Sequence, residues 1–179
     1  GNDEILRFLR ETEAKPYFAP GEGLAYSNTG YNLLALLVER LSGVPFEEFL
    51  QKNIFEPAGM TSTRCCHIRR DGVPFENYAR ATVFEDDKWV ADIDSAEDGD
   101  VVAFDGLNGD DYVYTNIFDM LRWDRALREG KVLTSEEQQI MYTPGRLNNG
   151  EDAVYDEGDG LGYGSKLTTW QPSPAPTRA

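Results

Sequence analysis

The sequence predicts a mainly α-helical α+β fold with a β-hairpin and part of a further sheet. Apolar residues recur at helical spacing in several segments, whereas strand-like patterns are confined to a pair of runs around one acidic turn and to one late segment. A self-sufficient α/β domain would need several buried strands alternating with helices, and the sequence does not show them. We therefore expect helices to dominate and strands to be few.

Apolar spacing and capping residues predict the helices. They cover residues 3–12, 28–43, 45–51, 115–128 and 134–142. Asn2 or Asp3 is the expected N-cap of the first helix, and Gly43 suits the left-handed position that ends the second. Thr134 and Glu137 form a capping box for the last helix. The second helix is so rich in leucine that we expect it to be buried on most sides.

The strands are predicted from β-rich runs bounded by turn residues. They cover residues 78–84 and 88–93, which flank the acidic turn 85–87, and residues 161–170. Residues 92–111 are rich in Asp and Gly and are predicted to form a long loop. Residues 171–179 are rich in proline and are not expected to hold regular structure. The predicted organisation is one domain, residues 1–170, followed by a Pro-rich tail at 171–179.

Composition narrows the range of partners. The 179 residues include 17 basic and 32 acidic side chains, giving a formal charge of −15 and a pI near 4.4. Nucleic acid and anionic membranes are bound through clustered Lys and Arg, so this surface predicts neither partner. No run reaches the roughly 18 apolar residues of a membrane span. The opening residues show neither the basic nor the apolar part of a signal peptide.

Cysteine, histidine and acidic residues give no sign of a metal or cofactor. Cys65 and Cys66 are adjacent, which is poor geometry for a mutual disulfide, and they lack metal-ligand spacing. The single histidine, His67, lies among arginines and is predicted to be a solvated loop residue. The acidic runs at 92–97, 98–100 and 156–160 fail the EF-hand pattern, which favours solvated loops. We therefore expect no metal and no cofactor.

The strongest candidate site is Tyr26-Ser27-Asn28. It follows the turn at Pro20-Gly21 and opens the apolar second helix. A phenol and a carboxamide two positions apart at a helix start can together supply a proton acceptor and a substrate-orienting amide. The alternative interpretation is an ordinary helix N-terminus, in which Asn28 is the cap and Tyr26 packs.

The context of this triplet is similar to that of a known family. The segments that carry the likeness are residues 20–31, 33–38, 41–43, 54–60, 109–123, 131–134 and 160–164. In order and spacing they resemble the serine β-lactamase and penicillin-binding-protein-like hydrolases, specifically the class C and esterase-like branch. The resemblance covers most of residues 15–170 and implies the helical region of a β-lactamase-like fold.

The resemblance implies roles for two residues. Tyr26 corresponds to the motif tyrosine, a catalytic residue that takes the proton of the nucleophile and returns it to the leaving group. A tyrosine near its ordinary pKa of about 10 is a poor base at neutral pH, so this role requires a neighbouring ammonium. Asn28 corresponds to the motif asparagine, which binds the substrate and the catalytic lysine. The intact relative would hydrolyse a small ester, a β-lactam or a peptide through an acyl-serine, in the periplasm or outside the cell.

Two further motifs of the family are missing from these 179 residues. No serine begins a Ser-x-x-Lys motif, Lys166-Leu167-Thr168 lacks the glycine of Lys-Thr-Gly, and His67-Ile68-Arg69 does not match His-x-Gly. By their order in the family, the nucleophile would precede residue 1 and the last strand would follow residue 170. We therefore expect a domain incomplete at both ends, with no serine-hydrolase activity by itself.

Two other functions stay open at the level of sequence. The chain could be a non-catalytic module that binds a ligand or partner with the retained half of the cleft. It could also be a structural piece that completes an active site with another chain, or that self-associates through exposed core. Whether the chain is itself an enzyme is therefore not decided by the sequence.

Overall fold

The structure is a computed structural model of the chain, and it describes residues 1–72, 76–80, 82–91, 106–153, 160–162 and 165–167. The chain forms two compact units. The first consists of residues 1–14 and 27–132, and the second of residues 15–26 and 133–179. Most of the predicted loop at 92–111 and the tail at 171–179 lie outside the described residues. The prediction of one domain over residues 1–170 stays a prediction.

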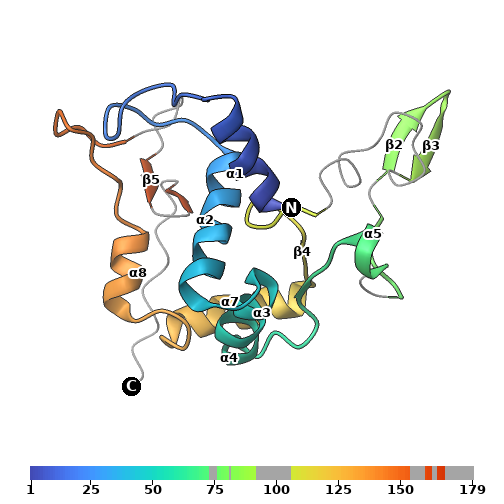
Figure 1. The fold of residues 1–179 in the computed structure, drawn as a ribbon. Helices are drawn as coiled ribbons and strands as arrows, with labels where there is room; N and C mark the ends of the chain where they lie inside the picture. Colours follow the sequence, from blue (N-terminus) through green and yellow to red (C-terminus); the bar gives the residue numbers. More distant parts are fainter. Residues whose placement is uncertain (73–75, 81, 92–105, 154–159, 163–164, 168–179) are drawn as a thin grey trace, which may run out of the picture. The chain divides into compact units, whose positions relative to one another are not determined.

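The first unit contains most of the helices (Figure 1). They are α1 (Asn2–Glu11), α2 (Asn28–Ser42), α3 (Phe46–Leu50), the π-helix η1 (Gln51–Phe55), α4 (Glu56–Ala58), α5 (Ile68–Asp71) and α7 (Ile117–Arg128). Its strands are β1 (Arg64–Cys65), β2 (Thr82–Glu85), β3 (Lys88–Ala91) and β4 (Val113–Tyr114). The second unit contains α8 (Ser135–Met141), β5 (Gly160–Gly162) and β6 (Ser165–Leu167). Among the described residues, every helix is too short or too polar to cross a membrane.

Local signals predicted the helix ends well. Gly43 ends α2 at φ +75° in the left-handed region, where a side chain is disfavoured. Thr134 and Glu137 form the predicted capping box of α8. The predicted cap of α1 is wrong, because Gly1 holds that position. Asn2 lies inside the helix and is buried. Its Nδ2 donates to the carbonyl oxygens of two distant residues, and its Oδ1 accepts from the backbone N–H of Asn108 instead of from its own helix end.

Helix α2 is less buried than its leucine content predicts. Of its residues only Asn32, Ala35 and Leu36 are buried, whereas Leu34, Leu37 and Leu41 are exposed. Helices α1 and α3 pack against α2 and cover the buried face (Figure 1). The expectation of burial on most sides is therefore wrong for this structure. An apolar pattern predicts which face of a helix can be buried, but it does not show whether another segment packs on that face.

The buried core of the first unit lies where η1 and α4 meet α7. It consists of Phe55, Ala58, Met60 and Ala126, with Trp123 among the partly buried residues packed against it. The backbone N–H of Met60 donates to the Phe55 carbonyl across the left-handed Gly59, at φ +72°, so the chain turns sharply out of α4. This turn leads directly into residues 61–63, which contact the N-terminal end of α7.

The described strands form two-stranded antiparallel sheets. The predicted hairpin is confirmed as β2 and β3, with Phe84 opposite Trp89 and their rings edge to face at 5.3 Å. Asp86 and Asp87 both have positive φ, which suits a tight two-residue turn. Residues 78–80 were predicted to belong to the first strand but lie outside β2. The predicted late strand is instead the hairpin of β5 and β6, within the part of that segment that the structure describes.

Candidate functional site

The predicted motif lies at the start of α2. Ser27 is the N-cap of the helix, and its Oγ accepts a hydrogen bond from the backbone N–H of Gly30 at 3.0 Å. Asn28 is therefore the first helical residue and not the cap, and its side chain is exposed. Tyr26 is 71% exposed. The interpretation in which Asn28 caps and Tyr26 packs is wrong in both parts, because the serine between them performs the capping.

The two predicted site residues belong to different units of the structure. Tyr26 is the last residue of the first segment of the second unit, and Asn28 belongs to the first unit. The surroundings of each side chain are therefore described only within its own unit. Within the first unit, the side chain of Asn28 forms no hydrogen bond with the residues that the structure describes, so its carboxamide is available to a ligand. The phenol of Tyr26 is also reachable from solvent.

His67 is buried, so its prediction as a solvated loop residue is wrong. Its side chain is 2% exposed. The Nδ1 atom accepts a hydrogen bond from the backbone N–H of Gly106 at 3.0 Å. The Nε2 atom lies 3.1 Å from an oxygen of Glu47 and 3.1 Å from the Oδ1 of Asn108. Because Nδ1 is an acceptor, the neutral ring carries its proton on Nε2, which donates toward those two oxygens.

The partners of His67 are themselves fixed by further polar contacts. The Glu47 carboxylate receives two hydrogen bonds from the Arg70 guanidinium, each at 3.0 Å. The carbonyl of Asn108 accepts from the side-chain amides of Asn2 and Asn32, at 2.8 and 3.0 Å. This network joins α1, α2, α3 and α5 to the loop at residues 106–110. This network can hold the loop at residues 106–110 in place, because each hydrogen-bond donor in it meets an acceptor.

The cysteines do not add a nucleophile. Cys65 and Cys66, the only cysteines in the sequence, form no disulfide. Burial, with a smaller contribution from the Glu47 charge, raises the pKa of the Cys65 thiol to about 12. The reactive form of cysteine is the thiolate, so Cys65 is a poor nucleophile at neutral pH.

A buried charged residue was also missed by sequence reasoning. Asp119, in the first turn of α7, is 0% exposed. Its Oδ2 accepts hydrogen bonds from the backbone N–H of Ser62 at 2.8 Å and from the Thr63 hydroxyl at 2.7 Å, while Arg122 pairs with Oδ1. Burial by itself raises the pKa of Asp119, but the hydrogen bonds from Thr63, Ser62 and Arg122 together lower the pKa below its ordinary value. The carboxylate therefore stays charged and ties the 61–63 segment to α7.

Neither buried group could be found from local sequence. An acidic residue in a first helical turn is normally a solvated partner of the helix dipole, and a histidine among arginines is normally exposed. The partners that bury His67 and Asp119 lie 20 to 57 residues away along the chain. Among the described residues, no group of His, Cys, Asp and Glu gathers in a way that could hold a metal ion.

The helical fold and the Tyr-x-Asn motif at a helix start are shared with the β-lactamase and penicillin-binding-protein-like class of proteins. The beta-lactamase family model matches residues 2–175. The chain therefore belongs to the beta-lactamase family.

Curated relatives give the same assignment. Penicillin-binding protein 4* of Bacillus subtilis (strain 168) is 35% identical over 159 residues, which are 88% of this chain and 35% of that protein. The D-aminopeptidase of Brucella anthropi is 41% identical over 56 residues, which are 31% of this chain and 10% of that protein. The chain thus spans about a third of the length of the Bacillus subtilis relative.

Solved structures share the fold. A penicillin binding protein from Bacillus halodurans has a TM-score of 0.70 and 26% identity, over 92% of this chain and 47% of that one. The D-amino acid amidase from Ochrobactrum anthropi SV3, complexed with D-phenylalanine, has a TM-score of 0.64 and 23% identity, over 93% of this chain and 46% of that one. The latter similarity shows the fold alone. The chain spans about half the length of both proteins.

Proposed function

We propose that this chain supplies the Tyr-x-Asn wall of an acyl-transfer site in a β-lactamase-family hydrolase. In the whole protein Tyr26 transfers the proton between nucleophile and leaving group, and Asn28 orients the substrate. The observation that carries the proposal is the position of the motif at the start of α2, inside the region that matches the family. Ser27 caps the helix, which leaves the side chains on either side of it available for chemistry.

The chemistry of this site needs groups that the 179 residues do not contain. Acyl transfer requires a nucleophile, an activating base and an oxyanion hole in one place. None of the seven serines is followed three positions later by lysine. Tyr26 also needs a nearby ammonium before it can act as a base at neutral pH. In the family, the lysine of the Ser-x-x-Lys motif is the usual source of that ammonium. We therefore propose that the 179-residue chain has no serine-hydrolase activity by itself.

We propose the substrate class of the whole protein from the names of two relatives. One is named for penicillin binding and another for aminopeptidase action on D-amino acids. Both names describe amide bonds whose carbonyl a serine can attack, one in a strained ring and one in a peptide. We propose an ester, a β-lactam or a peptide as substrate of the whole protein, with no cofactor, because an acyl-serine mechanism needs none.

Covalent labelling tests the inactivity of the chain. The purified protein is incubated with a fluorescent penicillin and, separately, with a fluorophosphonate, and its intact mass is measured. We expect the unmodified mass in both cases. A stoichiometric adduct on any serine would contradict the proposal, and peptide mapping would then identify the nucleophile.

The roles of Tyr26 and Asn28 need a separate experiment. In a longer protein that joins this chain to a family segment with Ser-x-x-Lys, we expect Tyr26→Phe to slow acylation by about 10²- to 10⁴-fold, the range for loss of a general base. Asn28→Ala should weaken substrate binding and acylation together. Tyr31→Phe, which removes a phenol five positions further along the chain, is the matched control and should leave the rate unchanged. Equal rates for the Tyr26 and Tyr31 variants would refute the assignment.

A further inference from the structure

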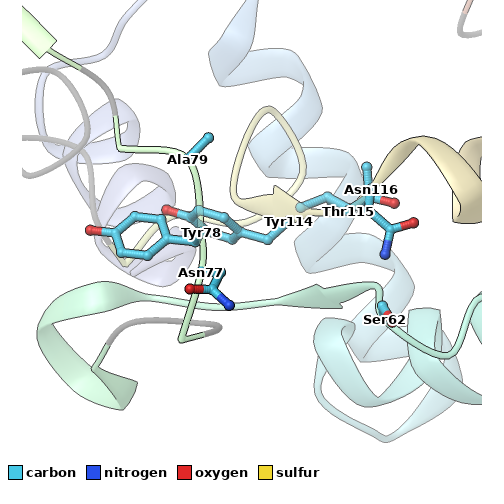
Figure 2. Close-up of a pocket in the computed structure, with 8 residues that line it drawn as sticks. Ser62, Asn77, Tyr78, Ala79, Tyr114, Thr115 and Asn116 are labelled. Atoms are coloured by element: carbon cyan, nitrogen blue, oxygen red, sulfur yellow. The ribbon is translucent and has the colours of Figure 1, made fainter.

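A pocket outside the Tyr-x-Asn motif opens at the N-terminal end of α7, within the first unit (Figure 2). Its volume is about 580 Å³, within the range of about 300 to 1,000 Å³ that is usual for small-molecule sites. Its polar and aromatic lining residues are Ser62, Asn77, Tyr78, Tyr114, Thr115 and Asn116. Among the described residues that line it, none is charged, and Asn28 is not one of them.

One wall of this pocket presents a hydrogen-bond acceptor whose direction is fixed. The Asp119 carboxylate can only accept, so the Thr63 hydroxyl must donate to it over their 2.7 Å contact. Thr63 then has no proton left for Thr115, although their oxygens are 2.7 Å apart. The Thr115 hydroxyl therefore donates to Thr63. The oxygen of Thr115 is left with lone pairs only, and it accepts from a ligand.

The next residue presents a donor. The Oδ1 of Asn116 accepts a hydrogen bond from the backbone N–H of Asp119 at 2.9 Å, as the N-cap of α7. This contact fixes which side of the carboxamide is oxygen, so the Nδ2 group is the side that can donate to a ligand. Thr115 and Asn116 thus offer an acceptor and a donor at neighbouring positions. The buried Asp119 carboxylate holds Thr115 through Thr63, and the backbone N–H of Asp119 holds Asn116.

The other end of the pocket is aromatic. The rings of Tyr78 and Tyr114 lie edge to face, with centroids 6.4 Å apart and planes at 78°, and Figure 2 shows them to the left of Thr115 and Asn116. The guanidinium of Arg80 lies 5.7 Å from the centroid of the Tyr78 ring. A tyrosine combines a flat apolar face with a polar hydroxyl. A ligand here meets an apolar surface on one side and directed hydrogen bonds on the other.

These features select among ligand classes. An anion would meet no charged group among the described lining residues and is repelled by the net charge of −15. A purely apolar ligand would leave the hydroxyl and amide groups of the wall without partners, which costs binding energy. A sugar ring has an apolar face of C–H groups and hydroxyls that both donate and accept. We propose that this pocket binds a neutral saccharide, with one ring against the tyrosines and its hydroxyls on Thr115 and Asn116.

Titration of the protein with neutral disaccharides tests the proposal. Cellobiose, maltose and diacetylchitobiose are added up to about 10 mM, a weak-binding limit, and ¹H–¹⁵N spectra and calorimetry are recorded. We expect at least one of them to shift the backbone signals of Thr115 and Asn116. The neutral peptide trialanine and the charged sugar glucuronic acid are expected to cause no shift at these residues. Absence of saccharide binding, or shifts caused equally by trialanine or glucuronic acid, would overturn the proposal.

Variants separate binding from folding. Asn116→Asp keeps the oxygen that caps α7 and replaces the donor with an acceptor, so affinity should fall about tenfold or more. Asn53→Asp adds the same charge at an exposed residue of η1 and should bind as the parent protein does. Thr115→Val should also weaken binding, whereas Thr115→Ser keeps the hydroxyl and should restore it. Unchanged affinity in Asn116→Asp, with thermal unfolding like that of the parent, would refute the assignment.

Discussion

Replacing Asp119 with alanine tests the buried contact between residues 61–63 and α7. The substitution leaves the backbone N–H of Ser62 without its acceptor, and the buried Thr63 hydroxyl loses Asp119 and keeps only Thr115 as a partner. Each unpaired buried donor costs about 1–3 kcal/mol. The ion pair with Arg122 adds little, because the Arg122 side chain is half exposed. We therefore expect the free energy of unfolding to fall by about 2–4 kcal/mol, from the two hydrogen bonds that the carboxylate no longer accepts.

Asp124→Ala on the same helix is the matched control. Asp124 pairs with Arg128 at 3.0 Å, and both side chains are more than half exposed. An exposed pair of this kind contributes about 0–1 kcal/mol. Urea unfolding followed by circular dichroism measures both variants. The reasoning is refuted if Asp119→Ala loses less than about 1 kcal/mol, or if the two variants lose equal amounts.

The same carboxylate predicts a pH dependence. Burial opposes the charge of Asp119, but hydrogen bonds from Thr63, Ser62 and Arg122 outweigh it, so the folded pKa is lower than the ordinary value. Its contribution to stability is therefore complete above the unfolded pKa of about 3.9 and is lost as the pH falls through the folded pKa. Asp119→Asn cannot titrate, so its urea midpoint should fall less steeply than that of the parent between about pH 5 and pH 2. Parallel pH profiles would contradict this assignment.

Two further predictions concern single positions of the first unit. Gly109→Ala should destabilise by about 2–4 kcal/mol, because its Cβ would lie 2.4 Å from the Tyr31 carbonyl oxygen. Gly106 has the same φ of +109°, but the space around a new Cβ is open. Gly106→Ala should therefore lower the free energy of unfolding by only about 1 kcal/mol. Equal shifts in thermal unfolding for the two variants would exclude the clash. Ser27→Ala should cost about 1 kcal/mol through the lost cap, and Ser27→Asp, which can still accept from the Gly30 N–H, should retain most of that stability; equal losses in the two variants would show that Ser27 does not act as a cap.

Much of the secondary structure could be predicted because its causes are local. The end of α2 at Gly43, the capping box of α8 and the hairpin of β2 and β3 depend on residues within four positions of one another. The family could also be predicted, since its motifs are short runs in a fixed order. The Tyr26 and Asn28 roles remain predictions that rest on those motifs.

The failures share a different cause. The cap of α1, the solvation of His67 and the burial of α2 each depend on residues that lie far away in the chain. Asn2 does not act as the expected cap because its Oδ1 accepts from the backbone N–H of Asn108, while its Nδ2 donates to the carbonyl oxygens of Asn32 and Asn108. His67 is buried because Glu47 and Gly106 supply partners for both ring nitrogens. No local pattern contains this information, because burial of a polar group is decided by whether distant partners satisfy it.

The sequence by itself determined the longer helices, the end of α2 at Gly43, the capping box of α8, the family and the Tyr-x-Asn motif, because each depends on neighbouring residues. It also determined that the 179 residues contain no Ser-x-x-Lys motif. Only the tertiary structure decided that Ser27 and not Asn28 caps α2, and that Asp119 and His67 are buried and paired. It also assembled the pocket at α7 from segments up to 54 residues apart in the chain. The physical reason is that hydrogen-bond partners and cavities arise from packing, which brings together groups that the chain itself keeps apart.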